Sequence, residues 1–266
     1  MEVIRFGSPS ERPPVLFIHG SYCGAWVWKR FFIPTFEKAG WWGAAISLRG
    51  HGNTDDKTKL NGFGINDYLE DVAAGSKLFE TPPILIGHSL GGLLAQKHAI
   101  DNEIAGMVLM ASPSLLGLNG SLQHIAIKRP SLAMQLGALM TVGPKHSNLR
   151  IIGNAMFSNP DSAKQNGNLL KMMQKESIMI PMEAIWPDFR RPVRFTPTLA
   201  LGGDCDAFIP EFEIRYAAHF WKGKSKILSG APHALMLDTC WPTVAKEIIG
   251  WMFSQYVRTP SRVPAA

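Results

Sequence analysis

Residues 84–96, ILIGHSLGGLLAQ, place a serine between glycines directly after a short apolar run. The apolar residues at the start predict a buried strand, and Leu90–Ile100 has the pattern of a helix. Ser89 is therefore expected at a tight turn that exposes its hydroxyl above the edge of a sheet. Gly87 and Gly91 leave room for the close approach of strand and helix. A serine in this setting is typical of a nucleophile.

Five further apolar runs follow the same pattern. They are Val15–Ile18, Ala44–Leu48, Met107–Met110, Thr198–Leu201 and Lys226–Leu228. Most are continuously apolar, as expected for strands that are buried on both faces of a parallel sheet. Helical patterns lie between them at Ile65–Leu78, Leu90–Ile100, Glu211–Phe220 and Val244–Phe253. This alternation predicts a three-layer α/β fold with a mostly parallel central sheet.

The alternation stops between residues 114 and 192. This stretch is rich in Leu and Met, is interrupted by Gly and Pro, and has no strand-like run. It is too long for an ordinary connection between two strands. We therefore expect an α/β core formed by 1–113 and 193–257, a helical cap formed by 114–192, and a disordered tail at 258–266.

The composition excludes several classes of protein. The 266 residues are 46% hydrophobic and 18% charged, which is typical of a globular chain and not of a disordered one. No run approaches the roughly 20 apolar residues of a membrane helix, and the first residues, MEVIRFGSPSERPP, lack the apolar core of a signal peptide. Three cysteines without metal-ligand spacing fit reduced thiols. These features predict a cytoplasmic protein.

The chain is basic, with a net charge of +6 and a pI of about 9.3. Its basic residues are scattered and form no stripe interleaved with aromatic residues, so we expect a solvated basic surface and no nucleic-acid partner.

A serine hydroxyl is a poor nucleophile unless an imidazole accepts its proton and an acid orients that imidazole. Two later strand ends supply these groups. Asp204 and Asp206 follow the run Thr198–Leu201, and His233 follows the run Lys226–Leu228. The order Ser, Asp, His is that of one hydrolase architecture. Either aspartate could be the acid on this reasoning.

Taken together, these segments resemble the α/β-hydrolase superfamily. The matching pieces are HG at 19–20, RGHG at 49–52, GHSLGG at 87–92, GDCDAFIP at 203–210 and GAPHALMLD at 230–238. The loop HGSYCGAWVW at 19–28 is also similar to that of plant methyl esterases and hydroxynitrile lyases. One departure is Ser47, where the family often has an aspartate.

The resemblance implies a role for each of the catalytic groups. Ser89 would be the nucleophile and His233 the general base. The family pattern Gly-x-x-Asp favours Asp206 over Asp204 as the orienting acid. The backbone N–H groups of Ser21 and Leu90 would form the oxyanion hole, where losing one donor typically costs about 10²–10³ in rate.

The activity implied is that of a carboxylesterase-like serine hydrolase that uses no cofactor and no metal. It would cleave an ester, thioester or lactone of a small to medium hydrophobic substrate through an acyl-enzyme. The substrate-contacting residues expected are His19, Tyr22, Trp26, His88 and Trp186. Two alternatives stay open: a lyase of the hydroxynitrile-lyase type and a ligand-binding receptor with a hydrolase fold. Ser89 argues against epoxide hydrolases and haloalkane dehalogenases, which use an aspartate here.

Overall fold

The computed structural model describes residues 1–54 and 57–257, and its centre is a seven-stranded sheet with the order β1-β3-β2-β4-β5-β6-β7. The strands are β1 Glu2–Phe6, β2 Val15–Ile18, β3 Gly43–Ser47, β4 Ile84–His88, β5 Gly106–Met110, β6 Thr198–Gly203 and β7 Lys224–Leu228. Only the β1–β3 pair is antiparallel. The predicted mostly parallel α/β sheet is confirmed.

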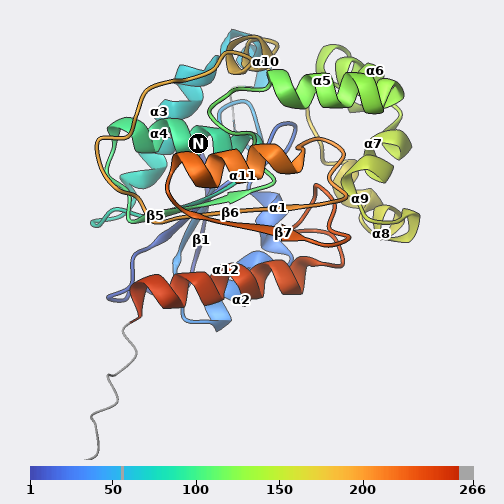
Figure 1. The fold of residues 1–266 in the computed structure, drawn as a ribbon. Coiled ribbons are helices and arrows are strands. Elements are labelled where there is room, and N and C mark those ends of the chain that lie inside the picture. The colour runs from blue at the N-terminus through green and yellow to red at the C-terminus, as the bar shows by residue number, and fades with distance from the viewer. Residues whose placement is uncertain (55–56, 258–266) are drawn as a thin grey trace, which may run out of the picture.

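Helices cover both faces of this sheet (Figure 1). One face carries α1 Trp26–Lys29, α2 Phe32–Lys38 and α12 Trp241–Tyr256. The other face carries α3 Ile65–Ser76, α4 Leu90–Asp101 and α11 Glu211–Phe220. Each layer closes over its own cluster of buried apolar side chains, because the inner strands are apolar on both faces. A short 3₁₀ helix, η1 Lys57–Gly62, precedes α3.

The sequence does not predict β1, α1 or α2. Strand β1, with the sequence EVIRF, lies at the edge of the sheet and is only partly buried, so it lacks the continuous apolar run of the inner strands. Helices α1 and α2 have 4 and 7 residues. Helices this short contain too few turns to show the periodic spacing of apolar residues that predicts a helix.

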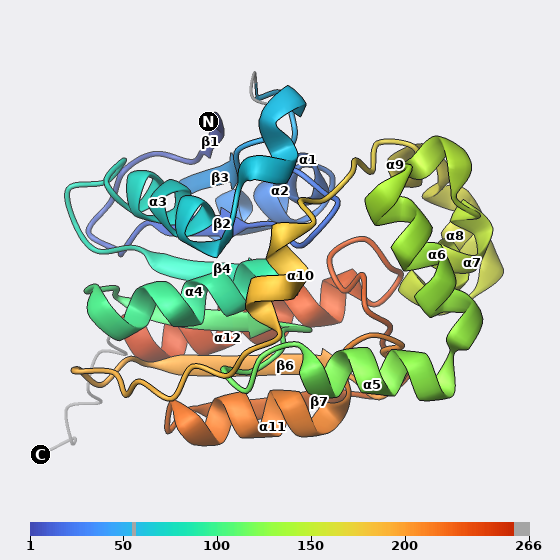
Figure 2. The same cartoon turned by 90° about the horizontal axis from the view of Figure 1, so that it is seen from above.

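Between β5 and β6 the described chain is helical. Its elements are α5 Asn119–Lys128, α6 Pro130–Thr141, η2 Pro144–His146, α7 Leu149–Met156, α8 Pro160–Gln165, α9 Gly167–Leu170 and α10 Met179–Ala184. Figure 2 shows α5–α9 gathered beside the sheet, while α10 lies nearer the middle of the molecule, where it contacts α3. The predicted tail at 258–266 lies outside the described residues. Within residues 1–54 and 57–257, no helix has both the length and the apolar character to span a membrane.

Candidate active site

Ser89 lies at the turn between β4 and α4. Its backbone adopts φ 51° and ψ −119°, a left-handed conformation that is unusual for any residue with a side chain. A Cβ atom at Gly87 would lie 2.3 Å from the carbonyl oxygen of Gly91, and one at Gly91 would lie 2.4 Å from that of Ile18. Only glycines allow the helix to start this close to the sheet. The local geometry is thus the strand–turn–helix expected from the sequence.

His233 and Asp206 meet beyond the ends of β7 and β6. His233 Nδ1 lies 2.9 Å from Oδ2 and 3.1 Å from Oδ1 of Asp206, and both residues are buried. Asp206 Oδ1 also accepts hydrogen bonds from the backbone N–H groups of Phe208 and Ile209, at 2.8 and 3.0 Å. Because a carboxylate only accepts hydrogen bonds, His233 carries its proton on Nδ1. Nε2 is then left free to act as a base.

Asp204 has a different place. Its side chain is exposed, and Oδ1 accepts a hydrogen bond of 2.7 Å from the backbone N–H of Gly230. It therefore links the two loops that follow β6 and β7. The structure brings Asp206, and not Asp204, to His233.

Ser89 and His233 line one cavity of about 320 Å³. Loop residues 20–23 and Phe208 form part of its wall, and apolar side chains of α5, α6 and α7 form much of the remainder. Within the described part of the chain, no hydrogen bond joins Ser89 Oγ to His233 Nε2. Such bonds often form or tighten only when substrate is bound.

The proposed oxyanion donors belong to the loop after β2 and to the start of α4. Neither Ser21 nor Leu90 donates a backbone hydrogen bond within residues 1–54 and 57–257. His19 orders this loop: its Nδ1 donates to the carbonyl of Gly20 at 2.8 Å, and its Nε2 accepts from the N–H of Leu48 at 3.0 Å. Burial lowers the pKa of His19 to about 3, which keeps the ring neutral.

His88 connects the serine turn to the loop of the proposed base. Its Nε2 donates to the backbone carbonyl oxygen of His233 at 3.0 Å. Burial, and then the neighbouring His233, hold the pKa of His88 well below its usual value. His88 is therefore a neutral, positioned ring in the cavity wall.

Of the five substrate-contacting residues expected from the sequence, Tyr22 and His88 line the cavity. The structure does not bring the other three to it. His19 is fully buried with both ring nitrogens bonded to backbone groups. Trp26 lines a separate small hollow nearby, and the side chain of Trp186, 70% exposed, lies after α10. The sequence alone does not show whether a tryptophan side chain in a loop points toward a cavity or toward solvent.

Phe208 and Glu176 are two of the cavity-lining residues that the sequence did not single out. The ring of Phe208 packs on that of His233, with centroids 4.5 Å apart. Glu176, from the stretch before α10, is buried and also lines the cavity. Phe208 could have been noted from its place two residues after Asp206. Glu176 has no spacing or motif that singles it out.

The loop of His233 is attached to the helices between β5 and β6. The N–H of Ala234 donates to the carbonyl of Met156 at 2.9 Å. Asp238 accepts hydrogen bonds from the hydroxyls of Ser158 and Ser162, at 3.0 and 2.9 Å. These contacts fix the loop and the helices as one unit.

Ser47, the departure from the family pattern, takes part in a local polar network. Its hydroxyl donates to Glu2 Oε2 at 2.5 Å and accepts from the N–H of Ala25 at 2.9 Å. The carboxylate of this network thus comes from β1. Among residues 1–54 and 57–257, no group of three or more His, Cys, Asp or Glu side chains is arranged to hold a metal ion.

Comparisons with known proteins agree with this fold. The chain is 29% identical over 141 residues to the magnesium-chelatase 30 kDa subunit of Rhodobacter capsulatus, a match that covers 51% of this chain and 46% of that protein. The match therefore spans less than half the length of that relative. Phospholipase YtpA of Bacillus subtilis (strain 168) is 26% identical over 196 residues, covering 66% of this chain and 72% of the relative.

A solved structure of a putative non-heme bromoperoxidase, BpoC from Mycobacterium tuberculosis H37Rv, superposes with a TM-score of 0.74. It shares 20% identity, and the match covers 96% of each chain, so it supports the fold alone. Residues 15–247 match the sequence model of the alpha/beta hydrolase family. Since this match covers most of the sequence, the chain belongs to the alpha/beta hydrolase family.

Proposed function

We propose that this protein is a serine hydrolase that cleaves a carboxylic ester, or a related thioester or lactone, through an acyl-enzyme on Ser89. The observation that carries the proposal is the buried Asp206–His233 pair, bonded at 2.9 Å, beside a serine held in a strained turn on the same cavity. The similarity to a phospholipase is consistent with ester chemistry.

The mechanism follows from the donors and acceptors present. His233 Nε2 accepts the Ser89 proton while Oγ attacks the carbonyl carbon. The N–H groups of Ser21 and Leu90 stabilise the negative oxygen of the tetrahedral intermediate. The protonated imidazole then gives its proton to the leaving alcohol. In the second half, His233 activates a water that releases the acid from Ser89.

The cavity supports a small to medium, largely hydrophobic substrate. A volume of about 320 Å³ lies at the lower end for ligand sites, and most of its wall is apolar. We also propose that residues 114–192 act as a cap over a core formed by 1–113 and 193–257, because side chains from both parts line the cavity.

The test is turnover of p-nitrophenyl esters with short and long acyl chains. Wild type should hydrolyse the shorter esters, and Ser89→Ala should lose about 10³-fold or more in kcat. Ser254→Ala, on the distant helix α12, is the matched control and should keep full activity. Activity should not change in EDTA.

A fluorophosphonate probe separates the alternatives. It should label wild type at Ser89, and Ser89→Ala should stay unlabelled. Turnover that survives in Ser89→Ala would contradict the nucleophile assignment. Labelling at Ser89 without turnover of any ester would favour a lyase or a receptor.

A further inference from the structure

The loop after β2 turns sharply beside the proposed nucleophile. Tyr22 adopts φ 65°, a left-handed conformation that a residue with a side chain rarely takes unless its surroundings hold it there. The neighbouring Ser21, whose N–H is a proposed oxyanion donor, lines the cavity together with Tyr22. At Gly20 the loop meets the serine turn, because a Cβ atom there would lie 3.0 Å from Cβ of Ser89. A small shift of this loop would move the Ser21 N–H away from the reacting carbonyl.

One residue of the segment 114–192 holds this loop. The backbone N–H of Gln174 donates to the carbonyl of Tyr22 at 2.9 Å. Within the parts of the chain that the structure describes, it is the only hydrogen bond that residues 21–23 make. The side chain of Gln174 is bonded as well, since its Oε1 accepts from the N–H of Gly52 at 2.7 Å. Gln174 thus connects the loop of Tyr22 with the turn at Gly52.

The loop and the turn that Gln174 connects already lie against each other. A Cβ atom at Gly24 would lie 2.9 Å from Cα of Gly52, so the two backbones touch. The N–H of Ala25 also donates to Ser47 Oγ at 2.9 Å. These contacts fix the end of the loop, and its middle is left to Gln174.

The peptide group that carries the Ser21 N–H is restrained on both sides. Its carbonyl belongs to Gly20 and accepts the 2.8 Å hydrogen bond from His19 Nδ1. Because C=O and N–H of a trans peptide point in opposite directions, this bond turns the Ser21 N–H away from His19. The bond from Gln174 fixes the carbonyl of Tyr22, which limits rotation of the chain on the other side of Ser21. Without Gln174, only one side of this peptide group would be fixed.

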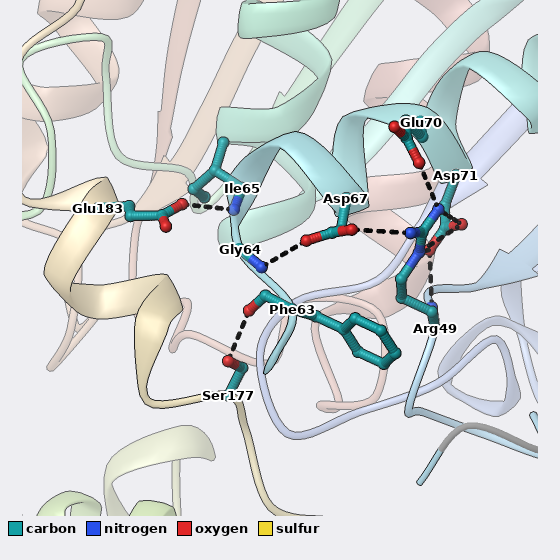
Figure 3. A network of polar contacts seen from close by, with 9 residues as sticks. All are labelled: Arg49, Phe63, Gly64, Ile65, Asp67, Glu70, Asp71, Ser177 and Glu183. Carbon is teal, nitrogen blue, oxygen red and sulfur yellow. Dashed lines mark hydrogen bonds and ion pairs between the residues drawn. The ribbon is translucent and has the colours of Figure 1, made fainter. Parts of the chain in front are cut away.

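The segment that carries Gln174 is attached to the start of helix α3. Ser177 Oγ donates to the carbonyl of Phe63 at 2.6 Å, two residues before the helix begins. Glu183 Oε2 accepts from the N–H of Ile65, the first residue of α3, at 2.7 Å (Figure 3). The backbone of Gln174 therefore has a firm support.

The turn at Gly52 is attached to the same helix. The N–H of Arg49 donates to Asp71 Oδ2 at 2.7 Å. The guanidinium of Arg49 forms ion pairs of 2.9 Å with Asp67 and with Asp71 (Figure 3). Both ends of the hydrogen bond between Gln174 and Gly52 thus rest on α3. Such support is what keeps a catalytic group in its productive geometry.

We propose that Gln174 is a positioning residue that holds the carbonyl of Tyr22, and through it the Ser21 N–H, in the place where that N–H stabilises the oxyanion. Gln174 is not among the residues that line the cavity in the described chain, so it acts through the loop. The inference rests on the proposed function, since the oxyanion forms only if Ser89 attacks a carbonyl. Loss of the Gln174 side chain should therefore weaken binding of the transition state and not of the substrate.

The test uses Gln174→Met, which keeps the length of the side chain but lacks Oε1. Without the bond to Gly52, the segment should hold Tyr22 less firmly. The kcat for a p-nitrophenyl ester should then fall about 10- to 100-fold with little change in KM. Gln165→Met, which replaces an exposed glutamine on α8, is the matched control and should keep full activity. Equal kcat for Gln174→Met and wild type would overturn the proposal.

Two inhibitors separate positioning from general damage to the cavity. Ser89 Oγ adds to the carbonyl carbon of an alkyl trifluoromethyl ketone while its proton passes to His233, and the adduct carries an oxyanion. An alkyl ether of the same length binds without reacting. Gln174→Met should weaken the ketone by about the factor by which it lowers kcat/KM and leave binding of the ether unchanged. If both compounds bind more weakly by the same factor, the proposal is wrong.

Hydrogen exchange separates a failure of this inference from a failure of the proposed function. If wild type hydrolyses no ester, the esterase proposal fails, and the protection of the amide at position 174 decides whether Gln174 holds the loop. After correction for intrinsic rates, faster exchange of this amide in Gln174→Met than in wild type, with unchanged exchange in α4, supports it. Equal exchange in the two proteins rules it out.

Discussion

His88 Nε2 donates a 3.0 Å hydrogen bond to the backbone carbonyl oxygen of His233, so the residue before the proposed nucleophile holds the residue proposed as base. The two imidazole rings lie with their centroids 4.7 Å apart. The bond crosses 145 residues of sequence and ties the end of β4 to the loop after β7. The separation of the two proposed catalytic groups thus depends on a third side chain.

Replacing His88 with phenylalanine should reduce both stability and rate. The carbonyl of His233 would lose its partner, which costs about 1–3 kcal/mol in the free energy of unfolding. The loop would then hold the imidazole less firmly, so kcat should fall more than KM changes. Urea unfolding and ester kinetics measure the two effects. His88→Gln, which retains a side-chain donor, should recover part of the loss; equal activity in the two variants would argue against the role of the bond.

Asp206→Asn should reduce kcat by about 10⁴-fold with little loss of stability. The asparagine can still accept from the N–H groups of Phe208 and Ile209, but its amide no longer stabilises the imidazolium of His233. Steady-state kinetics with a p-nitrophenyl ester measure this change. Asp204→Asn, which alters the exposed bond to Gly230, is the control and should keep most of the activity. The reverse result would make Asp204 the acid.

Gly87→Ala should destabilise the fold by about 3 kcal/mol, because its Cβ would meet backbone atoms that cannot move aside. Gly250→Ala tests the opposite case. A Cβ at Gly250, in helix α12, has no atom within 4 Å, so this change should stabilise the protein by about 0.5–1 kcal/mol. Thermal and urea unfolding of both variants give the comparison. Similar stabilities for the two would contradict the close packing at β4 and α4.

The free energy of unfolding should fall as the pH decreases below about 6.5. Burial lowers the pKa of His19 to about 3 and that of His98 to about 4, and holds the pKa of His88 well below its usual value. Below pH 6.5 the unfolded chain binds protons at these side chains and the folded chain does not. Each contributes a loss of about 1.4 kcal/mol per pH unit until its folded pKa is reached. Urea unfolding between pH about 7.5 and about 5 measures the slope, and His98→Gln should make it shallower; an unchanged slope would exclude His98.

The core of the fold could be read from the sequence because its strands are buried on both faces. Runs such as Val15–Ile18 and Met107–Met110 are continuously apolar, and each forms part of a strand. The glycines around Ser89 likewise predicted a tight turn. The structure shows that a Cβ atom at either glycine would clash with nearby backbone atoms. Local sequence therefore determined these strands and the serine turn, but not the edge strand β1.

Contacts between distant segments could not be read in this way. Glu176 gains its surroundings from Tyr68, 108 residues earlier in the chain. Trp186 is a large aromatic residue of the kind that often lines pockets, but its side chain lies on the surface. The helices between β5 and β6 follow no regular alternation with strands, so nothing in their sequence shows which faces turn toward the cavity.

The bonds from Ser158 and Ser162 to Asp238 have a consequence for protein engineering. Asp238 lies five residues after His233, so the helices that shape the cavity also brace the segment of the proposed base. A chimaera that exchanges only residues 114–192 for those of a relative would remove that brace and leave the buried Asp238 with the hydroxyl of Thr239 and the N–H of Cys240 as its remaining donors. Transferring the substrate preference of a relative to this protein would therefore require residues 233–238 to be exchanged together with the helices.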